Sequence, residues 1–344
     1  MKLWEKNTCS QSTGSVHKYL RNLALHLVGR EKLRANLLHE VDEAIRRHLH
    51  SWATRGAVNV HEGSSQMTFE FASKKIIGYD ERKYGKKLRE NYIAFREGMV
   101  SVPLYFPGTA FHACLQGRKN ALKVIKDIYQ ERKASKIPGN DFLDRILEEV
   151  EKENAVLKDS VAVDLVFMLL FAAFETISQS ITLITKYIND HPDVLAELTR
   201  EHEEILSRRE DKNSEITWEE YKSMTFTHMV INETVRLANI APMTFRKVVK
   251  DIEINGYTIP AGWVIMIALP VVHFDPDKYE NPFEFNPWRW QGKELHTGSR
   301  TFMAFGGGVR LCTGAEFAKL NLAIYVHYLV HQVQVVSNQR RRTL

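Results

Sequence analysis

The stretch Phe302–Leu320, FMAFGGGVRLCTGAEFAKL, says most about the fold of this 344-residue chain. Three consecutive glycines precede Arg310 and Cys312, and the apolar spacing that follows predicts a last helix to about Val333. The stretch fits the pattern F-x-x-G-x-R-x-C-x-G, filled by Phe305, Gly308, Arg310, Cys312 and Gly314. Five fixed positions, each at a residue frequency of roughly 5%, make a chance match rare.

The residue types in this loop suit a metal-bound thiolate beneath a flat ligand. Glycines let the backbone pass close under such a ligand, where a Cβ atom would collide with it. A helix that starts after Gly314 directs its free N–H groups towards Cys312, which favours the thiolate. Arg310 supplies a cation suited to a haem propionate. We therefore interpret Cys312 as an iron ligand; the alternative is an inert buried cysteine beside a glycine turn.

Composition excludes several other classes of protein. The hydrophobic share of 44% and the charged share of 26% are typical of a globular protein, and a net charge of +5 does not require nucleic acid. Three scattered cysteines form neither a disulfide framework nor a zinc motif. No phosphate-loop or dinucleotide-binding motif is present. The arginine run 340–342 reads as a solvated tail.

The order of elements predicts one mostly helical domain with a small strand region. Helices are expected at 15–54, 67–77, 118–132, 159–189 and 228–238, with a capping box at Thr217 and Glu220. Asn255-Gly256 predicts a hairpin. The apolar segment 100–111 is broken by prolines and is either an exposed entrance or a buried connector. Asp164 and Glu175 interrupt the helix at 159–189, which favours a buried helix over a membrane span.

At this point the chain resembles the cytochromes P450, which are haem-thiolate monooxygenases. ETVR matches the E-x-x-R motif of that family with Glu233 and Arg236, and FNPWRW places Arg289 at the family's third partner position. The resemblance implies that these three residues lock a helix to the irregular region beneath the haem. Their implied role is structural.

Two further groups of site residues follow from the resemblance. FAAFETIS is similar to the motif A-G-x-[DE]-T-[TS], which makes Glu175 and Thr176 the acid–alcohol pair that relays protons towards dioxygen. It departs from the motif, since Ala173 replaces glycine and Ile177 replaces a hydroxyl residue. The resemblance also implies haem-propionate partners, namely His17, Arg21 and Arg246, and substrate-pocket residues, namely Phe167, Phe171, Ala172, Pro242 and Met243.

The resemblance is strongest to the plant branch that oxidises triterpenoids and brassinosteroids. It implies insertion of one oxygen atom from O2 into a C–H bond of an apolar polycyclic substrate. Haem b is the implied cofactor, and NADPH supplies electrons through the FAD and FMN of cytochrome P450 reductase. Lys319 could face that reductase. Full-length members lie on the cytosolic face of the endoplasmic reticulum membrane.

Family members usually begin with a membrane anchor, a proline-rich hinge, first strands and first helices, which we do not find before Met1. We therefore expect residues 1–344 to be a single haem-binding domain, mainly α with a small β region, incomplete at the N-terminus and at the C-terminus. Such a chain alone would be soluble or peripheral, and would bind haem poorly. Two alternatives stay open: an isomerase or dehydratase that needs no dioxygen, and a truncated haem-binding protein without catalysis.

Overall fold

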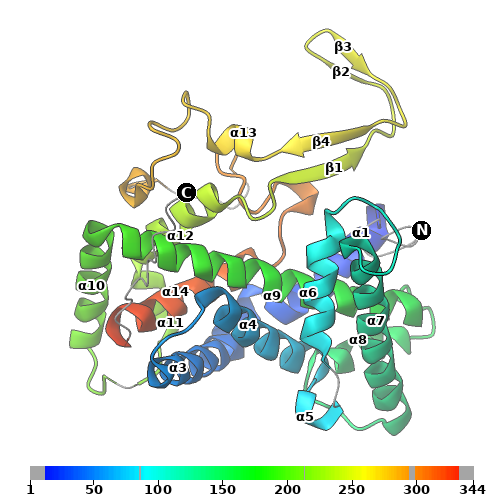
Figure 1. Cartoon of the computed structure of the whole chain (residues 1–344), viewed down its shortest axis with the longest axis horizontal. Helices are drawn as coiled ribbons and strands as arrows, with labels where there is room; N and C mark the ends of the chain where they lie inside the picture. Colours follow the sequence, from blue (N-terminus) through cyan, green and yellow to red (C-terminus); the bar gives the residue numbers. More distant parts are fainter. Residues whose placement is uncertain (1–11, 85–86, 213, 294–298, 333–344) are drawn as a thin grey trace. The chain divides into compact units, whose positions relative to one another are not determined.

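The computed structural model describes residues 12–84, 87–212, 214–293 and 299–332. Contacts divide the chain into two compact units, residues 1–178 and 179–344, and helix α9 (Asp159–Asp190) contains the division (Figure 1). The arginine run 340–342 and the rest of segment 335–344, where we expect the family's C-terminal strands to be missing, lie outside the described residues. A single haem-binding domain over the whole chain stays a prediction.

Helices are the regular elements of the first unit among its described residues. Its elements are α1 (Gly14–Val28), α2 (Arg30–Lys32), a π-turn (Leu33–Leu37), α3 (Leu38–Arg55), α4 (Val60–Ile77), α5 (Glu81–Tyr84), α6 (Leu88–Met99), α7 (Ala110–Ser135), α8 (Phe142–Val150) and the first part of α9. Helices α6 and α8 have no counterpart in the sequence prediction. Segment 100–109, between α6 and α7, is irregular, and Val102, Leu104 and Phe106 in it are exposed.

Local capping explains why α4 and α7 begin before the predicted residues. The side chain of Asn59 accepts a hydrogen bond from the backbone N–H of Glu62 at 3.1 Å. Thr109 does the same for His112 at 3.2 Å. Each cap satisfies a backbone donor that has no partner within the helix, so the helix starts there.

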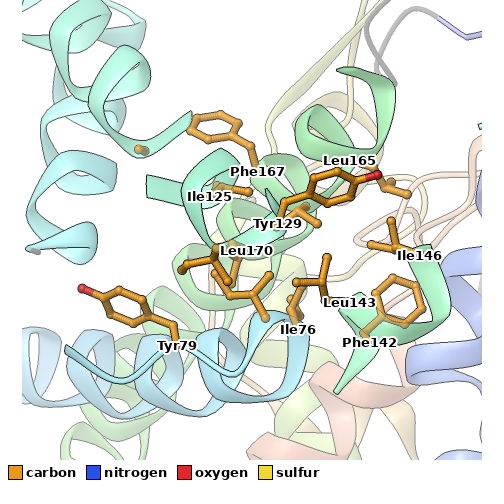
Figure 2. Packing of buried hydrophobic residues seen from close by; sticks show 14 of the residues in the cluster. Ile76, Tyr79, Ile125, Tyr129, Phe142, Leu143, Ile146, Leu165, Phe167 and Leu170 are labelled. Carbon is orange, nitrogen blue, oxygen red and sulfur yellow. The ribbon is translucent and has the colours of Figure 1, made fainter. Parts of the chain in front are cut away.

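The core of the first unit collects apolar side chains from α4, α6, α7, α8 and α9, as Figure 2 shows for Ile76, Tyr129, Leu143 and Phe167. Helices α6 and α7 approach closely because glycines line their contact. A Cβ added to Gly98 would lie 2.0 Å from the Ala110 carbonyl oxygen. Among the described residues, α9 is the helix long and apolar enough to cross a membrane, but half of its most apolar window is buried in the protein.

The elements of the second unit are α10 (Pro192–Ser207), α11 (Trp218–Ser223), α12 (Thr225–Ala238), β1 (Met243–Lys247), β2 (Ile252–Ile254), β3 (Tyr257–Ile259), β4 (Val264–Ala268), α13 (Pro270–His273), two 3-10 turns (Pro287–Trp290 and Gly308–Arg310) and α14 (Ala315–Gln332). In chain order, its strands follow α10–α12 and precede α13 and α14. The predicted capping box is confirmed, since Thr217 and Glu220 cap α11 reciprocally.

Two short antiparallel ladders make up the sheet structure of the described residues. β2 and β3 pair through the predicted turn, where Asn255 and Gly256 both have positive φ values, of 50° and 82°. That conformation is the one for which an Asn-Gly pair is favoured in hairpins. β1 and β4 form a second ladder in which Phe245 lies opposite Met266. Both of these side chains are more than half exposed.

Candidate haem-thiolate site

The glycine loop places the Cys312 side chain at the surface of the second unit. Its backbone N–H donates to the Phe305 carbonyl at 2.9 Å, and the Leu311 N–H donates to the Gly308 carbonyl at 3.1 Å. Gly306 and Gly308 have φ values of 76° and 63°, in the left-handed region that glycine tolerates. These bonds fix the loop so that the cysteine is exposed.

Helix α14 begins at Ala315, three residues after the cysteine, and its first full turn closes with Ala318 N–H on the Gly314 carbonyl at 2.8 Å. The positive end of an 18-residue helix therefore follows the sulfur directly. Such a position favours a thiolate over a thiol. The structure thus gives Cys312 the exposure and the electrostatic setting of a metal ligand.

Arg310 and Arg246 supply positive charge close to this loop. Partial burial lowers the pKa of Arg310, and the nearby positive charge of Arg246 lowers it further. Arg246 itself donates to the hydroxyl of Thr244 and to the carbonyl of Phe245. Two guanidinium groups that repel each other form a setting that an anion would stabilise.

The residues present fit a haem group. A Cβ built on Gly306 meets no atom closer than 3.9 Å and one built on Gly308 meets none within 4 Å, so open space lies beside the loop at both positions. A thiolate is a suitable ligand for haem iron, and the arginines suit its carboxylates. Cys312 would hold the iron, and Arg310 and Arg246 would bind the propionates.

The carboxylate of Glu233 joins Arg236 and Arg289 in a buried network. Arg236 donates to it twice, at 2.8 Å each, and Arg289 Nε donates once at 2.8 Å. Trp290 Nε1 and the Asn286 backbone N–H add bonds of 2.9 and 3.1 Å. The network ties α12 to the segment 286–290.

In the first unit, the two residues of the acid–alcohol motif are adjacent on α9, but one is buried and the other is exposed. Glu175 is buried and accepts from Arg96 on α6 at 3.3 and 3.4 Å. Thr176 is exposed, and its hydroxyl donates to the Ala172 carbonyl at 2.8 Å. With that proton engaged, the Thr176 oxygen acts towards other groups as a hydrogen-bond acceptor. The carboxylate is instead held by an arginine that the motif did not indicate.

The other predicted site residues divide between surface and core. His17 and Arg21 lie one turn apart on α1, both partly buried. Ala172, Pro242 and Met243 are exposed, and Phe171 is partly buried. Phe167 lies elsewhere than expected, because its ring is fully buried and stacks on Tyr92 at 4.9 Å. It belongs to the core of the first unit.

Sequence reasoning did not identify three residues that bond to the predicted site residues or to the glycine loop: Arg96, Trp290 and His273. His273 on α13 is fully buried and bonds to both Asn239 and the backbone of Met303. A further difference concerns Lys319, which lies over the Phe305 ring at 5.8 Å and is partly buried. Burial lowers the pKa of that amine. Its contact with the reductase stays a prediction.

An exposed loop cysteine before a helix and a buried E-x-x-R network are the two features expected of the haem-thiolate class of protein. The family model described as cytochrome P450 matches residues 4–343. The chain is 49% identical over 320 residues to "Cytochrome P450 87A3" of Oryza sativa subsp. japonica, covering 92% of this chain and 62% of that protein. It is 41% identical to "Cucurbitadienol 11-hydroxylase" of Siraitia grosvenorii, covering 93% of this chain and 67% of that protein.

A solved structure, "Retinoic acid bound cyanobacterial CYP120A1", shares the fold with a TM-score of 0.82 at 24% identity, covering 95% of this chain and 74% of that chain. The chain belongs to the cytochrome P450 family. The expected fold class, mainly α with a small β region, is confirmed. The chain spans about 62% of the length of the rice relative.

Proposed function

We propose that this chain carries the catalytic site of a haem-thiolate monooxygenase, which inserts one oxygen atom from O2 into a C–H bond. The observation that carries the proposal is the exposed Cys312 at the start of α14, held by the Phe305 carbonyl. Bound haem would supply the oxygen chemistry, and the thiolate would donate electron density that favours cleavage of the O–O bond.

The chain's own residues would contribute positioning and proton handling. Arg310 and Arg246, with Arg21 and His17 from α1, would bind the propionates and orient the ring. Phe305, Gly308 and Gly314 would shape the backbone under it. Thr176 would accept and pass protons with its exposed hydroxyl. Glu175 would supply the acid once its bond to Arg96 opens, because in the described structure that carboxylate is engaged.

We further propose an apolar polycyclic substrate of the triterpenoid or sterol type. The name of the Siraitia grosvenorii relative, which acts on cucurbitadienol, supports this class. Phe171, Ala172, Pro242 and Met243 would contact it. Electrons would come from NADPH through the FAD and FMN of a reductase, at the cytosolic face of the endoplasmic reticulum membrane, as the family resemblance implies.

The test is a reduced carbon-monoxide difference spectrum of the purified chain supplied with haem, beside Cys312→His. We expect a thiolate-type Soret band in the parent chain and its loss in the variant. An identical band in both proteins would contradict ligation by Cys312. Cys114 serves as a matched control, since it is buried in the first unit and Cys114→Ser should keep the band.

The second candidate is a haem-binding protein without catalysis, which is favoured by the engagement of the Glu175 carboxylate with Arg96. It predicts the thiolate band and substrate-induced spectral shifts without product when NADPH and reductase are added. Product that forms without NADPH would instead indicate an isomerase or dehydratase.

A further inference from the structure

His273 connects the end of α12 to the start of the glycine loop. Its Nδ1 lies 2.8 Å from Asn239 Oδ1, and its Nε2 accepts the backbone N–H of Met303 at 3.1 Å. Asn239 is the C-cap of α12, with a left-handed φ of 43°. The imidazole therefore bridges Asn239 and Met303, which are 64 positions apart in the sequence.

These two bonds require the neutral form of the imidazole in one tautomer. Met303 donates, so Nε2 must carry a lone pair, and the proton must then sit on Nδ1 and face Asn239 Oδ1. The orientation of that amide is set independently, because Asn239 Nδ2 donates to the Leu237 carbonyl. A protonated His273 would present a second N–H to the Met303 donor and lose that bond.

The backbone of Met303 takes part in the first turn of the glycine loop. Its carbonyl accepts the Gly306 N–H at 2.8 Å, and two residues later the Phe305 carbonyl accepts the Cys312 N–H. The backbone of His273 is itself held, since Arg236 Nη1 donates to its carbonyl at 2.7 Å. A chain of hydrogen bonds thus runs from the Glu233 network through His273 to the cysteine loop.

We propose that His273 is a positioning residue for Cys312: as a neutral imidazole it holds Met303 and thereby the loop that presents the sulfur. The inference rests on the proposed role of Cys312 as the iron ligand. Burial lowers the pKa of His273 to about 4, and the positive charge of Arg236 contributes. Arg236 and Glu233, both on α12, are the charged groups that act on this imidazole among the described residues. The neutral form is thus the native one near neutral pH.

The test is hydrogen exchange of the Met303 amide in the full chain supplied with haem, corrected for the intrinsic rate at each pH. An opening that exposes His273 lets it titrate near its ordinary pKa of 6.5, so Met303 protection should fall by roughly tenfold to thirtyfold between pH 7.5 and 5. In His273→Phe, which cannot accept the bond, protection at pH 7.5 should fall by about threefold to tenfold.

His273→Gln keeps an acceptor without a titrating group, so it should protect Met303 at pH 7.5 and abolish the decline at pH 5. His228→Gln is the matched control. His228 is partly buried and its pKa is lowered mainly by burial, but its Nε2 contacts the Tyr221 carbonyl instead of the loop. The parental exchange profile at Met303 should survive in that variant.

The proposal is overturned if His273→Phe and His273→Gln exchange like the parent at both pH values, or if His228→Gln removes the pH dependence equally. The thiolate Soret band, recorded on the same samples, separates this outcome from failure of the proposed function. If Cys312 is not the iron ligand, the parent chain lacks that band, whereas the exchange contrast between the His273 variants can still be present.

Discussion

The indole Nε1 of Trp290 donates to Glu233 Oε2 at 2.9 Å, inside the second unit where the Glu233 side chain has no solvent exposure. This contact extends the predicted ion network by a neutral donor. It means that the carboxylate at its centre is satisfied by groups from two separate segments of chain. The charge on Glu233 is thus central to how those segments are held.

Replacing Glu233 with Gln should destabilise the chain by about 3–5 kcal/mol, because Arg236 and Arg289 would be left as uncompensated cations, the first fully buried. Trp290→Phe, which removes one hydrogen bond to a charged group and keeps the ring, should cost about 2 kcal/mol. Urea unfolding measures both values. Equal losses in the two variants would contradict the central role of the charge.

Arg96→Met should destabilise the first unit by roughly 2–3 kcal/mol, since it leaves the buried Glu175 carboxylate without its cation. Adding Glu175→Gln should restore most of that loss, because no buried charge then remains unpaired. Glu97→Gln is the control: Glu97 is an exposed partner of Arg96, and its loss should change stability by about 0.5 kcal/mol or less. A double variant no more stable than Arg96→Met would refute the pairing.

Gly308→Ala should strain the loop by about 1–2 kcal/mol, because an L-residue at a φ of 63° adopts a disfavoured left-handed conformation. No steric clash contributes, since a Cβ there meets nothing within 4 Å. Gly314→Ala is matched to it: its backbone is outside the left-handed region, and its Cβ would lie at an ordinary 4.0 Å from Cys312 Sγ. Urea unfolding and haem uptake should therefore show a larger loss at position 308.

Acid should weaken the second unit through its buried histidines. Burial lowers the pKa of His273 to about 4 and also lowers that of His228. In the unfolded chain these histidines bind protons near pH 6.5, whereas in the folded chain they stay neutral to lower pH. The free energy of unfolding is therefore highest above pH 6.5 and declines as pH falls towards 4. At pH 5 the loss from His273 is about 2 kcal/mol. Urea unfolding at pH 7.5 and 5 measures it, and a double Gln variant at both histidines should show a smaller decline.

Thr176→Val should lower the product formed per NADPH consumed, with a stability change of about 0.5 kcal/mol or less, because the residue is exposed. Thr199→Val is a matched control, since the Thr199 hydroxyl on α10 also bonds four residues back, in an exposed bond to the Leu195 carbonyl at 2.8 Å. Equal coupling in the two variants would argue against a proton-handling role for Thr176.

Local signals predicted much of this fold. The Asn255-Gly256 turn and the Thr217–Glu220 capping box act within a few residues, so the sequence alone determines them. Helix α6 was missed even though Leu88, Tyr92 and Phe95 are buried at helical spacing. That signal was available, but the helix is short and lies before the proline-rich segment.

Partners of the site residues could not be predicted in the same way. Arg96 and Glu175 are 79 positions apart, and Met303 and His273 are 30 apart. Neither pair has a spacing rule, because helix packing and loop geometry bring the groups together. Motif matching found Cys312, Thr176 and the set of Glu233, Arg236 and Arg289. Arg96, Trp290 and His273, which bond to or near these residues, emerge only from tertiary structure.

The ladder of β1 and β4 has a practical consequence for anyone who purifies this chain. Each of these strands is bonded to one neighbour within the described residues. Phe245 and Met266 lie exposed on them, and Trp263 is exposed directly before β4. Strand edges with unpaired backbone groups and exposed apolar side chains can pair with strands of other molecules, so aggregation should increase with protein concentration. Dilute samples, mild detergent and a light-scattering check belong at the beginning of the bench work.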